Sequence, residues 1–219
     1  MSPSIVRLAH VAVPILHFAG EDAVGAVRLV PLGRALPPHR AVGSAVGLPT
    51  VAFGVGAQDG PRDGLHLVQV TALVLRYRAL SPEAAELVVG RLKGLRLAHL
   101  LYSLHEGADE DEASFVVVVP LSRPLLSTEY GAAWSALQAD LEGLACWEGV
   151  MPAGPLPVPW CPPAALPRAA YVLCDGFPAD VDALLTRRTL RDAYPGPTER
   201  RRRAQRQRAR GASGGGARR

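Results

Sequence analysis

The run Phe115–Val119 (FVVVV) constrains the fold of this chain of 219 residues more than any other segment. A phenylalanine followed by valines is typical of a strand that is buried on both faces. Pro120 lacks the amide proton that further pairing requires, so the strand is predicted to end there. The letters PLSRP at 120–124 then form a short polar turn that carries Arg123. Since Ser127 and Thr128 supply N-cap chemistry, a helix is predicted to follow.

Periodicity and turn residues predict further elements around this unit. The predicted strands are Leu67–Tyr77, Leu97–His105, Phe115–Val119 and Ala170–Cys174. The predicted helices run from Pro82 to about Lys93, from about Thr128 to Leu144, and from Ala179 to Arg188. From residue 67 to residue 174 the order is strand, helix, strand, strand, helix, strand, which is the split βαβ order. We therefore expect an α+β fold with an RRM-like or ferredoxin-like core, a four-stranded antiparallel sheet with two helices on one face.

Apolar side chains at helical spacing predict the buried faces of the two core helices. The first face comprises Ala84, Leu87, Val88 and Leu92, and the second comprises Tyr130, Trp134, Leu137 and Leu141. Tyr130 and Trp134 are accordingly interpreted as core residues, not as stacking platforms for a ligand.

Three parts of the chain differ in composition. Repeated proline and glycine interrupt every candidate element in residues 1–66. We expect an irregular N-terminal extension of short strands and loops, with a candidate helix near Glu21–Val27, that packs on a core formed by residues 67–190. Residues 195–219 contain no aromatic side chain and many glycines and arginines, so a disordered tail is predicted.

The tail carries the basic charge of the chain. Residues 200–219 contain nine arginines and no acid, and the basic run begins with Arg200, Arg201, Arg202 and Arg203. The other 199 residues hold 15 basic and 20 acidic side chains, so the net charge of +4 conceals an acidic body. Such a tail suits phosphate backbones, because neutralising phosphates releases counterions without any need for folded geometry. The alternative is a solubilising extension with no ligand.

Several classes of protein are excluded by what the sequence lacks. Its apolar runs fall short of the roughly 20 residues that a membrane span needs, and no clean export signal is recognised. Cys146, Cys161 and Cys174 form neither a CxxC pair nor a disulfide framework. Motifs for a phosphate-binding loop, a nucleophilic serine or a zinc protease are missing, and the acidic run at 109–112 lacks the ligand spacing of a calcium loop. We therefore expect a cytoplasmic protein with no membrane partner, no metal and no cofactor.

Two motifs carry a resemblance to the archaeo-eukaryotic primase superfamily. PLSRP at 120–124, followed by Glu129-Tyr130 and Trp134, resembles the strand–turn–helix unit of the compact bacterial and phage members. Tyr-Ser-Leu-His at 102–105 is similar to the Tyr-Thr-Thr-His strand end of that family, whose histidine contacts nucleotide phosphates. The resemblance extends from Leu48 to Leu185 and implies the same α+β core.

The metal-binding carboxylates of that family are missing at the matching positions. Family members end a strand in Asp-hydrophobic-Asp, whereas this chain has Arg76 and Arg78 there. Val116 replaces a basic residue of the family, and no Asp lies near Ala145 and Cys146, where a third acidic motif is expected. Because guanidinium groups stay ionised and repel divalent cations, the charge of the site is inverted. The resemblance therefore implies a degenerate member that is catalytically inactive, with no catalytic residue.

The two arginines suggest a different use for the site. Alternation along the strand places Arg76 and Arg78 on one face of the sheet and Tyr77 on the other. With His105 and Arg123 they are predicted to form a cationic phosphate-binding patch, since guanidinium forks match phosphate oxygens. Under the alternative interpretation the arginines are solvated, His105 is a surface histidine, and Arg123 holds neighbouring carbonyl groups.

The predicted function is that of a primase-like protein without catalysis. We expect it to bind single-stranded or primed DNA through the patch and the tail arginines, or to be an accessory in replication of a mobile element. A separate replicative helicase is a further candidate partner. Two alternatives stay open. One is a structural or protein-interaction module that uses the acidic loop and the sheet face. The other is an active DNA primase whose acids come from Glu106, Asp109 or Glu148.

Overall fold

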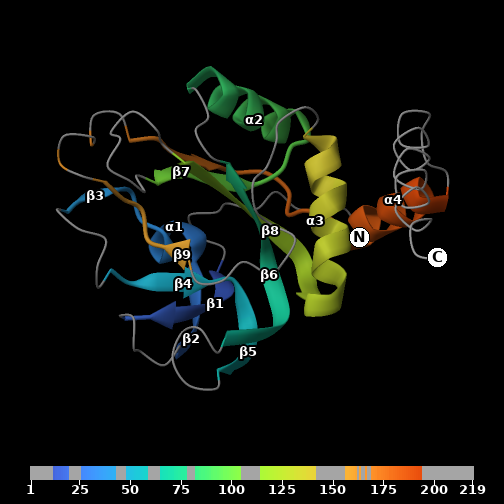
Figure 1. The fold of residues 1–219 in the computed structure, drawn as a ribbon, viewed down its shortest axis with the longest axis horizontal. Helices are drawn as coiled ribbons and strands as arrows, with labels where there is room; N and C mark the ends of the chain where they lie inside the picture. Colours follow the sequence, from blue (N-terminus) through green and yellow to red (C-terminus); the bar gives the residue numbers. More distant parts are fainter. Residues whose placement is uncertain are drawn as a thin grey trace, which may run out of the picture.

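The computed structural model describes residues 12–19, 26–42, 48–58, 65–77, 82–104, 114–141, 156–161, 163, 166 and 169–193. The largest sheet has the order β11-β7-β8-β6-β5 and comprises β5 (Gly54–Gln58), β6 (Leu65–Tyr77), β7 (His99–Leu104), β8 (Ser114–Leu126) and β11 (Tyr171–Cys174) (Figure 1). The second sheet has the order β2-β1-β4-β9 and comprises β1 (Ala12–Phe18), β2 (Ala26–Pro31), β4 (Thr50–Ala52) and β9 (Leu156–Pro157). A parallel ribbon joins β3 (Arg40–Ala41) to β10 (Trp160–Cys161). The helices are α1 (Leu32–Ala35), α2 (Pro82–Gly94), α3 (Ser127–Asp140) and α4 (Val181–Ala193).

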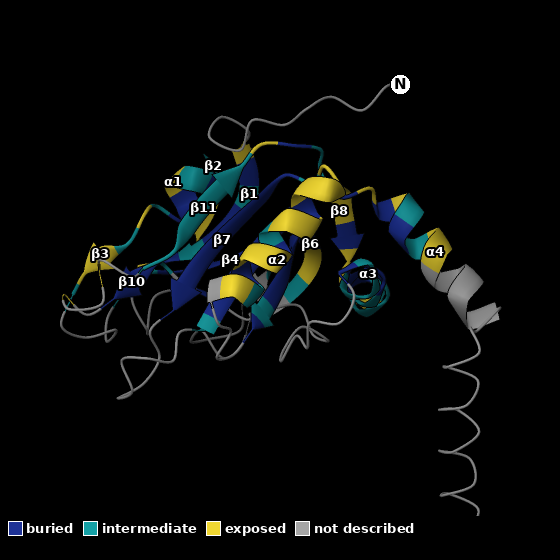
Figure 2. Ribbon diagram, turned by 90° about the horizontal axis from the view of Figure 1, so that it is seen from above, coloured by how far each residue is buried: buried dark blue, intermediate teal, exposed yellow. Residues whose placement is uncertain are grey.

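Both faces of the five-stranded sheet are buried. Leu73, Leu75 and Tyr77 of β6 pack into one core with apolar residues of α2, α3 and α4. Ala72 and Val74 of the same strand pack into a second core with β1, β4 and α1. Figure 2 shows the exposed outer face of α2 above the buried strands β6 and β7. The molecule therefore has three layers, and the sheet face that a partner was expected to use is covered.

The α+β class is confirmed, but the sheet differs from the predicted four-stranded one. A fifth strand, β5, pairs antiparallel with the first half of β6 and comes from the segment expected to be irregular. One strand, β8, lies between β6 and β7, as a split βαβ unit requires. β11 lies at the edge beside β7, and the chain between α3 and β11 contributes β9 to the second sheet and β10 to the ribbon.

The N-terminal region forms strands β1 to β5, where the sequence predicted an irregular extension of short strands and loops. The candidate helix near residues 21–27 is wrong at its described end, since Ala26 and Val27 belong to β2. Val27 and Leu29 alternate with Arg28 and Val30, which is the period of a strand. Residues 20–25 lie outside the described ranges.

A single residue, Phe53, carries the chain from the second sheet into the five-stranded sheet. β4 ends at Ala52 and β5 begins at Gly54, while the carbonyl of Phe53 accepts a bond of 3.1 Å from the amide of Thr71. A Cβ atom on Gly54 would lie 2.2 Å from the carbonyl oxygen of Gln69. Glycine is therefore required where the two strands approach most closely.

The predicted turn at PLSRP is wrong, because β8 continues through it to Leu126. Pro120 pairs with Ala72 of β6, and its carbonyl accepts a bond of 2.8 Å from the amide of Ala179. The amide of Ser122 returns a bond of 2.9 Å to Ala179. The backbone of β8 is thus hydrogen-bonded to Ala179, which is distant in sequence. The strand therefore continues although Pro120 has no amide proton.

The helices begin and pack much as the sequence predicts, with two differences. Ser127 and Thr128 do not cap α3 by a side-chain hydrogen bond; instead, the amide of Leu126 donates to the carboxylate of Glu129 at 3.1 Å. In α2 the buried residues are Ala85, Val88 and Leu92, whereas Leu87 is 59% exposed. The buried residues of α3 match the prediction and include Tyr130, Trp134 and Leu137, with Leu141 buried just after its end.

Two aromatic side chains of α3 cover an open edge of β6. β5 pairs with β6 only as far as Val70, so no strand of the described residues lies beside the backbone of Val74 on that side. The indole nitrogen of Trp134 donates to the carbonyl of Val74 at 3.1 Å. The hydroxyl of Tyr130 accepts from the amide of Val74 at 3.3 Å and lies 3.5 Å from its carbonyl. Side chains thereby satisfy the backbone groups that an edge strand leaves unpaired.

Several predicted features lie outside the described residues. These are the acidic loop at 109–112, Cys146 and the arginine-rich tail. Among the helices that are described, none has the length and apolar content needed to cross a membrane.

Candidate functional site

Two of the predicted site residues are described, and they do not share a site. Arg78, His105 and Arg200–Arg203 lie outside the described residues. Arg76 is half-buried on β6 and pairs with Val116 of β8. Arg123 lies seven positions further along β8, about 23 Å away at a strand rise near 3.3 Å per residue. The structure therefore does not bring Arg76 and Arg123 together.

Arg123 is held by neighbouring acids at the surface. Its guanidinium lies 2.7 Å from the carboxylate of Asp182 in α4 and 3.7 Å from that of Glu129 in α3. It also donates to the carbonyl of Pro124 at 3.1 Å. The hydrogen bond to Asp182 is the main cause of its raised pKa. Arg123 joins β8 to the first turns of α3 and α4, so this guanidinium already has anionic partners.

Arg76 lies on the side of the sheet opposite Tyr77, as alternation predicted. Tyr77 is buried among the residues that face the helices. Arg76 is in register with Val116, Val116 with Tyr102, and Tyr102 with Tyr171. This row faces the second sheet, and its far end is covered, since the hydroxyl of Tyr171 donates to the carbonyl of Leu36 at 2.8 Å.

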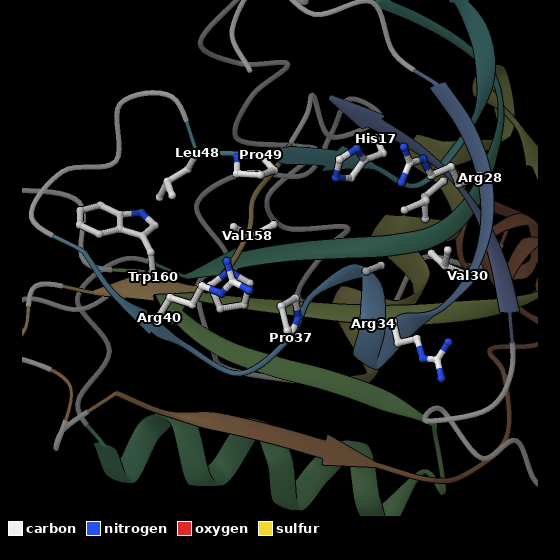
Figure 3. A pocket seen from close by; sticks show the side chains of 13 residues that line it. His17, Arg28, Val30, Arg34, Pro37, Arg40, Leu48, Pro49, Val158 and Trp160 are labelled. Carbon is white, nitrogen blue, oxygen red and sulfur yellow. The ribbon is translucent and has the colours of Figure 1, made fainter. Parts of the chain in front are cut away.

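A cavity of about 240 Å³ lies between the second sheet, α1 and the β3–β10 ribbon (Figure 3). Four cationic or titratable side chains and one indole distinguish it from an ordinary gap in packing: His17, Arg28, Arg34, Arg40 and Trp160. The rest of its wall is apolar and includes Ile15, Val30, Ala35, Leu48 and Val158 together with three prolines.

Strand pairing places the first part of this cavity. In β1 and β2, Ile15 pairs with Arg28 and Val13 with Val30, so these side chains share one face of the second sheet. His17 lies on the same face, two positions beyond Ile15. Pro31 then ends β2 and precedes α1, which brings Arg34 to the rim.

The β3–β10 ribbon closes the other end. Arg40 and Trp160 are in register across the ribbon, and the amide of Arg40 donates to the carbonyl of Pro159 at 3.3 Å. The amide of Val158 donates to the carbonyl of Pro49 at 3.1 Å. Segments near residues 40, 49 and 160 are thereby held together as one wall.

The electrostatics of the cavity favour an anion. Among the described residues that line the cavity, none is acidic. Arg28, Arg34 and Arg40 make no ion pair with any residue in the described part of the chain. Burial, together with the nearby charge of Arg28, lowers the pKa of His17 below its usual 6.5, so this imidazole is neutral at pH 7. The three guanidinium groups therefore supply fixed positive charge that no carboxylate of the described residues neutralises.

The side chains are arranged around the cavity in two groups. Figure 3 shows His17 and Arg28 together on one side and Trp160 with Arg40 on the other, while Arg34 extends away from the rest. Arg28, Arg34 and Arg40 are exposed, whereas Trp160 is buried. An apolar interior with a cationic rim suits a ligand that combines a flat apolar group with a phosphate.

Sequence reasoning missed this cavity because it treated residues 1–66 as irregular. One signal was available: no acidic residue occurs between residues 23 and 58, although Arg28, Arg34, His39 and Arg40 all lie there. The contribution of Trp160 carries no local signal, because it depends on pairing with residue 40. No group of three or more His, Cys, Asp or Glu side chains that could hold a metal ion occurs within the described residues.

Comparisons with known proteins give one similarity. No family model matches the chain, and no curated protein matches it. Among solved structures, it is similar to the AEP domain of the primase-polymerase (PrimPol) of cyanophage S-2L, with 14% sequence identity and a TM-score of 0.44. The match covers 82% of this chain and 89% of the phage domain. At this TM-score and identity, no residue role is transferred from the phage domain to this chain.

Proposed function

We propose that this chain is a primase-like protein that binds single-stranded nucleic acid through the cationic cavity and does not synthesise it. The observation that carries the proposal is the set of Arg28, Arg34 and Arg40 around an apolar cavity whose described lining residues include no acid. Phosphates are the anions that arginine forks match best, and nucleic acid joins phosphates to flat apolar bases.

The location of these charges strengthens the proposal. Residues 1–199 carry more acidic than basic side chains, so nonspecific attraction of a polyanion to the body as a whole is not expected. A cationic cavity within an acidic body is a local arrangement, which favours a defined contact. The arginines of the tail add sequence-independent attraction to the same strand.

The test is fluorescence anisotropy with a labelled single-stranded oligonucleotide at several salt concentrations. The proteins compared are the full chain, a chain ending at Pro197, and each of these with Arg28→Gln and Arg40→Gln. The matched control removes two exposed cations of α2 instead, by Arg91→Gln and Lys93→Gln.

We expect the chain ending at Pro197 to retain salt-dependent binding. For single strands, each phosphate contact contributes about 0.7 to the slope of log K against log salt concentration, so losing Arg28 and Arg40 lowers that slope by about 1.4. The α2 control should leave the slope unchanged. If affinity disappears with the tail, or if both double variants behave alike, the folded body does not bind nucleic acid through this cavity.

The absence of synthesis is supported by the sequence alone. Arg76 and Arg78 stand where the resembled family carries its metal-binding acids. Primer synthesis assays with magnesium or manganese test this part, and a template-dependent product would refute it. An accessory role in replication of a mobile element, with primed DNA and a helicase as partners, is the cellular role that this activity would fit.

A further inference from the structure

We propose that the cavity holds one unpaired nucleotide of the bound strand, with its base against Trp160 and its phosphate at Arg40. This inference rests on the proposed function and adds to it the unit that the site recognises. In this proposal the cavity contacts the base of the nucleotide as well as attracting the phosphate backbone.

Trp160 has the surroundings of a ligand contact. The residue is only 9% exposed, yet its indole N–H makes no hydrogen bond with the described part of the chain. Buried indole N–H groups usually find a partner. Among the described residues, four side-chain atoms are fully buried without a hydrogen-bond partner, and the indole nitrogen of Trp160 is not among them. This nitrogen therefore reaches solvent. Figure 3 places the indole at one end of the cavity with the other lining residues to one side of it.

Arg40 is the cation best placed to hold the phosphate of the same nucleotide. It is the register partner of Trp160 in the β3–β10 ribbon, and both side chains line the cavity. Adjacent strands lie about 4.8 Å apart, so the guanidinium and the indole reach the two ends of one nucleotide. Arg28 and His17, on the far side, are available to the next phosphate along the strand.

The small size of the cavity suits a single nucleotide better than two. Its volume of about 240 Å³ lies below the roughly 300–1,000 Å³ of sites for drug-sized ligands. A base inside a duplex is stacked and paired, so it cannot enter without leaving the helix. A base in a single strand has no such restriction, and aromatic side chains accept every base because each has a π face.

The test measures the contribution of the bases at constant phosphate charge. The full chain is titrated with labelled oligothymidine, with an abasic oligonucleotide of the same length, and with a duplex. The salt concentration is about 0.3 M, so that contacts by the tail are screened. The variants are Trp160→Leu, Trp160→Phe and Arg40→Gln. Competition by free thymidine monophosphate distinguishes a strand from a free nucleotide as the source of the unit.

The wild type should bind oligothymidine about tenfold more tightly than the abasic strand, because the base stacks on the indole. Trp160→Leu should bring that ratio close to one, and Trp160→Phe should retain most of it, because a phenyl ring still stacks. Since both ligands are measured on the same protein, partial loss of stability in a variant does not affect the ratio. Arg40→Gln should weaken the binding of both oligonucleotides, while the ratio of their affinities stays as in the wild type.

The outcomes separate this inference from the proposed function. Equal affinity of the wild type for the two strands, with both weakened by Arg28→Gln and Arg40→Gln, would refute the base contact and leave nucleic-acid binding intact. If thymidine monophosphate binds but no oligonucleotide does, the nucleotide subsite stands and the proposed function fails. A ratio unchanged in Trp160→Leu would also overturn the inference.

Discussion

The aromatic cover over the open edge of β6 allows a quantitative test of the fold. The hydroxyl of Tyr130 accepts the amide proton of Val74, and the indole of Trp134 donates to the carbonyl of Val74. Tyr130→Phe leaves a buried amide without an acceptor, which costs about 1–3 kcal/mol. Trp134→Phe removes a bond of 3.1 Å, but the Tyr130 hydroxyl lies 3.5 Å from the same carbonyl and takes over part of its role.

The double variant is therefore the informative one. Only when both side chains are changed does the carbonyl of Val74 lose every donor. The loss should exceed the sum of the single variants by about 1 kcal/mol, within the range known for residues that share a partner. Urea denaturation followed by far-ultraviolet circular dichroism measures the free energies of unfolding. For a chain of this size, each 1 kcal/mol corresponds to a fall of about 2–4 °C in Tm.

Additivity would contradict this account of the sheet edge. If the losses of Tyr130→Phe and Trp134→Phe add within about 0.5 kcal/mol, the two side chains do not share the carbonyl of Val74. Single variants that each lose less than about 0.5 kcal/mol would show that water, not α3, satisfies this edge.

Three further predictions concern packing and protonation. Gly54→Ala should lower the free energy of unfolding by about 1–3 kcal/mol in urea denaturation, because its Cβ would collide with the carbonyl of Gln69. Gly90→Ala, on the open face of α2, should instead raise it by about 0.5–1 kcal/mol. Similar losses for both variants would refute the clash. Burial lowers the pKa of His99 below 6.5, so the unfolded chain binds the proton more tightly than the folded one. The free energy of unfolding should therefore fall as the pH drops below 6.5, by at most about 1.4 kcal/mol per pH unit. His99→Gln should flatten this dependence between pH 7 and pH 5, and an unchanged slope would contradict the prediction. Protonation of His17 adds a cation to the cavity, so the affinity for an oligonucleotide should rise as the pH falls from 7 to 5. Fluorescence anisotropy should show a smaller rise in His17→Gln. An equal rise in both proteins would assign the pH dependence to other groups.

Local patterns predicted the central elements, because those elements depend on neighbouring residues. The strand at Leu67–Tyr77, the helix beginning at Pro82 and the buried face of α3 all follow from periodicity and terminal residues. PLSRP shows the limit of such patterns. Pro120 would end an isolated strand, but the backbone of Ala179 pairs with this edge of β8, and nothing near residue 120 indicates it.

The second sheet and the cavity could not be predicted in the same way. Strands β3, β4, β9 and β10 are two or three residues long, too short to show a period, and they exist through pairing with distant segments. The cationic residues could be recognised from the absence of acids between residues 23 and 58. Their placement beside an indole could not, because it requires the register between Arg40 and Trp160.

That register also determines when the cavity can appear during synthesis of the protein. Contacts between residues far apart in the chain form only after both have left the ribosome, and they are slow to form because a long loop must close. Arg40 precedes Trp160 by 120 residues in the chain, so Arg28, Arg34 and Arg40 leave the ribosome well before the wall that contains Trp160. The nascent chain therefore exposes these positive charges before the cavity exists, and the cavity forms only when the segment around residue 160 pairs with the segment around residue 40.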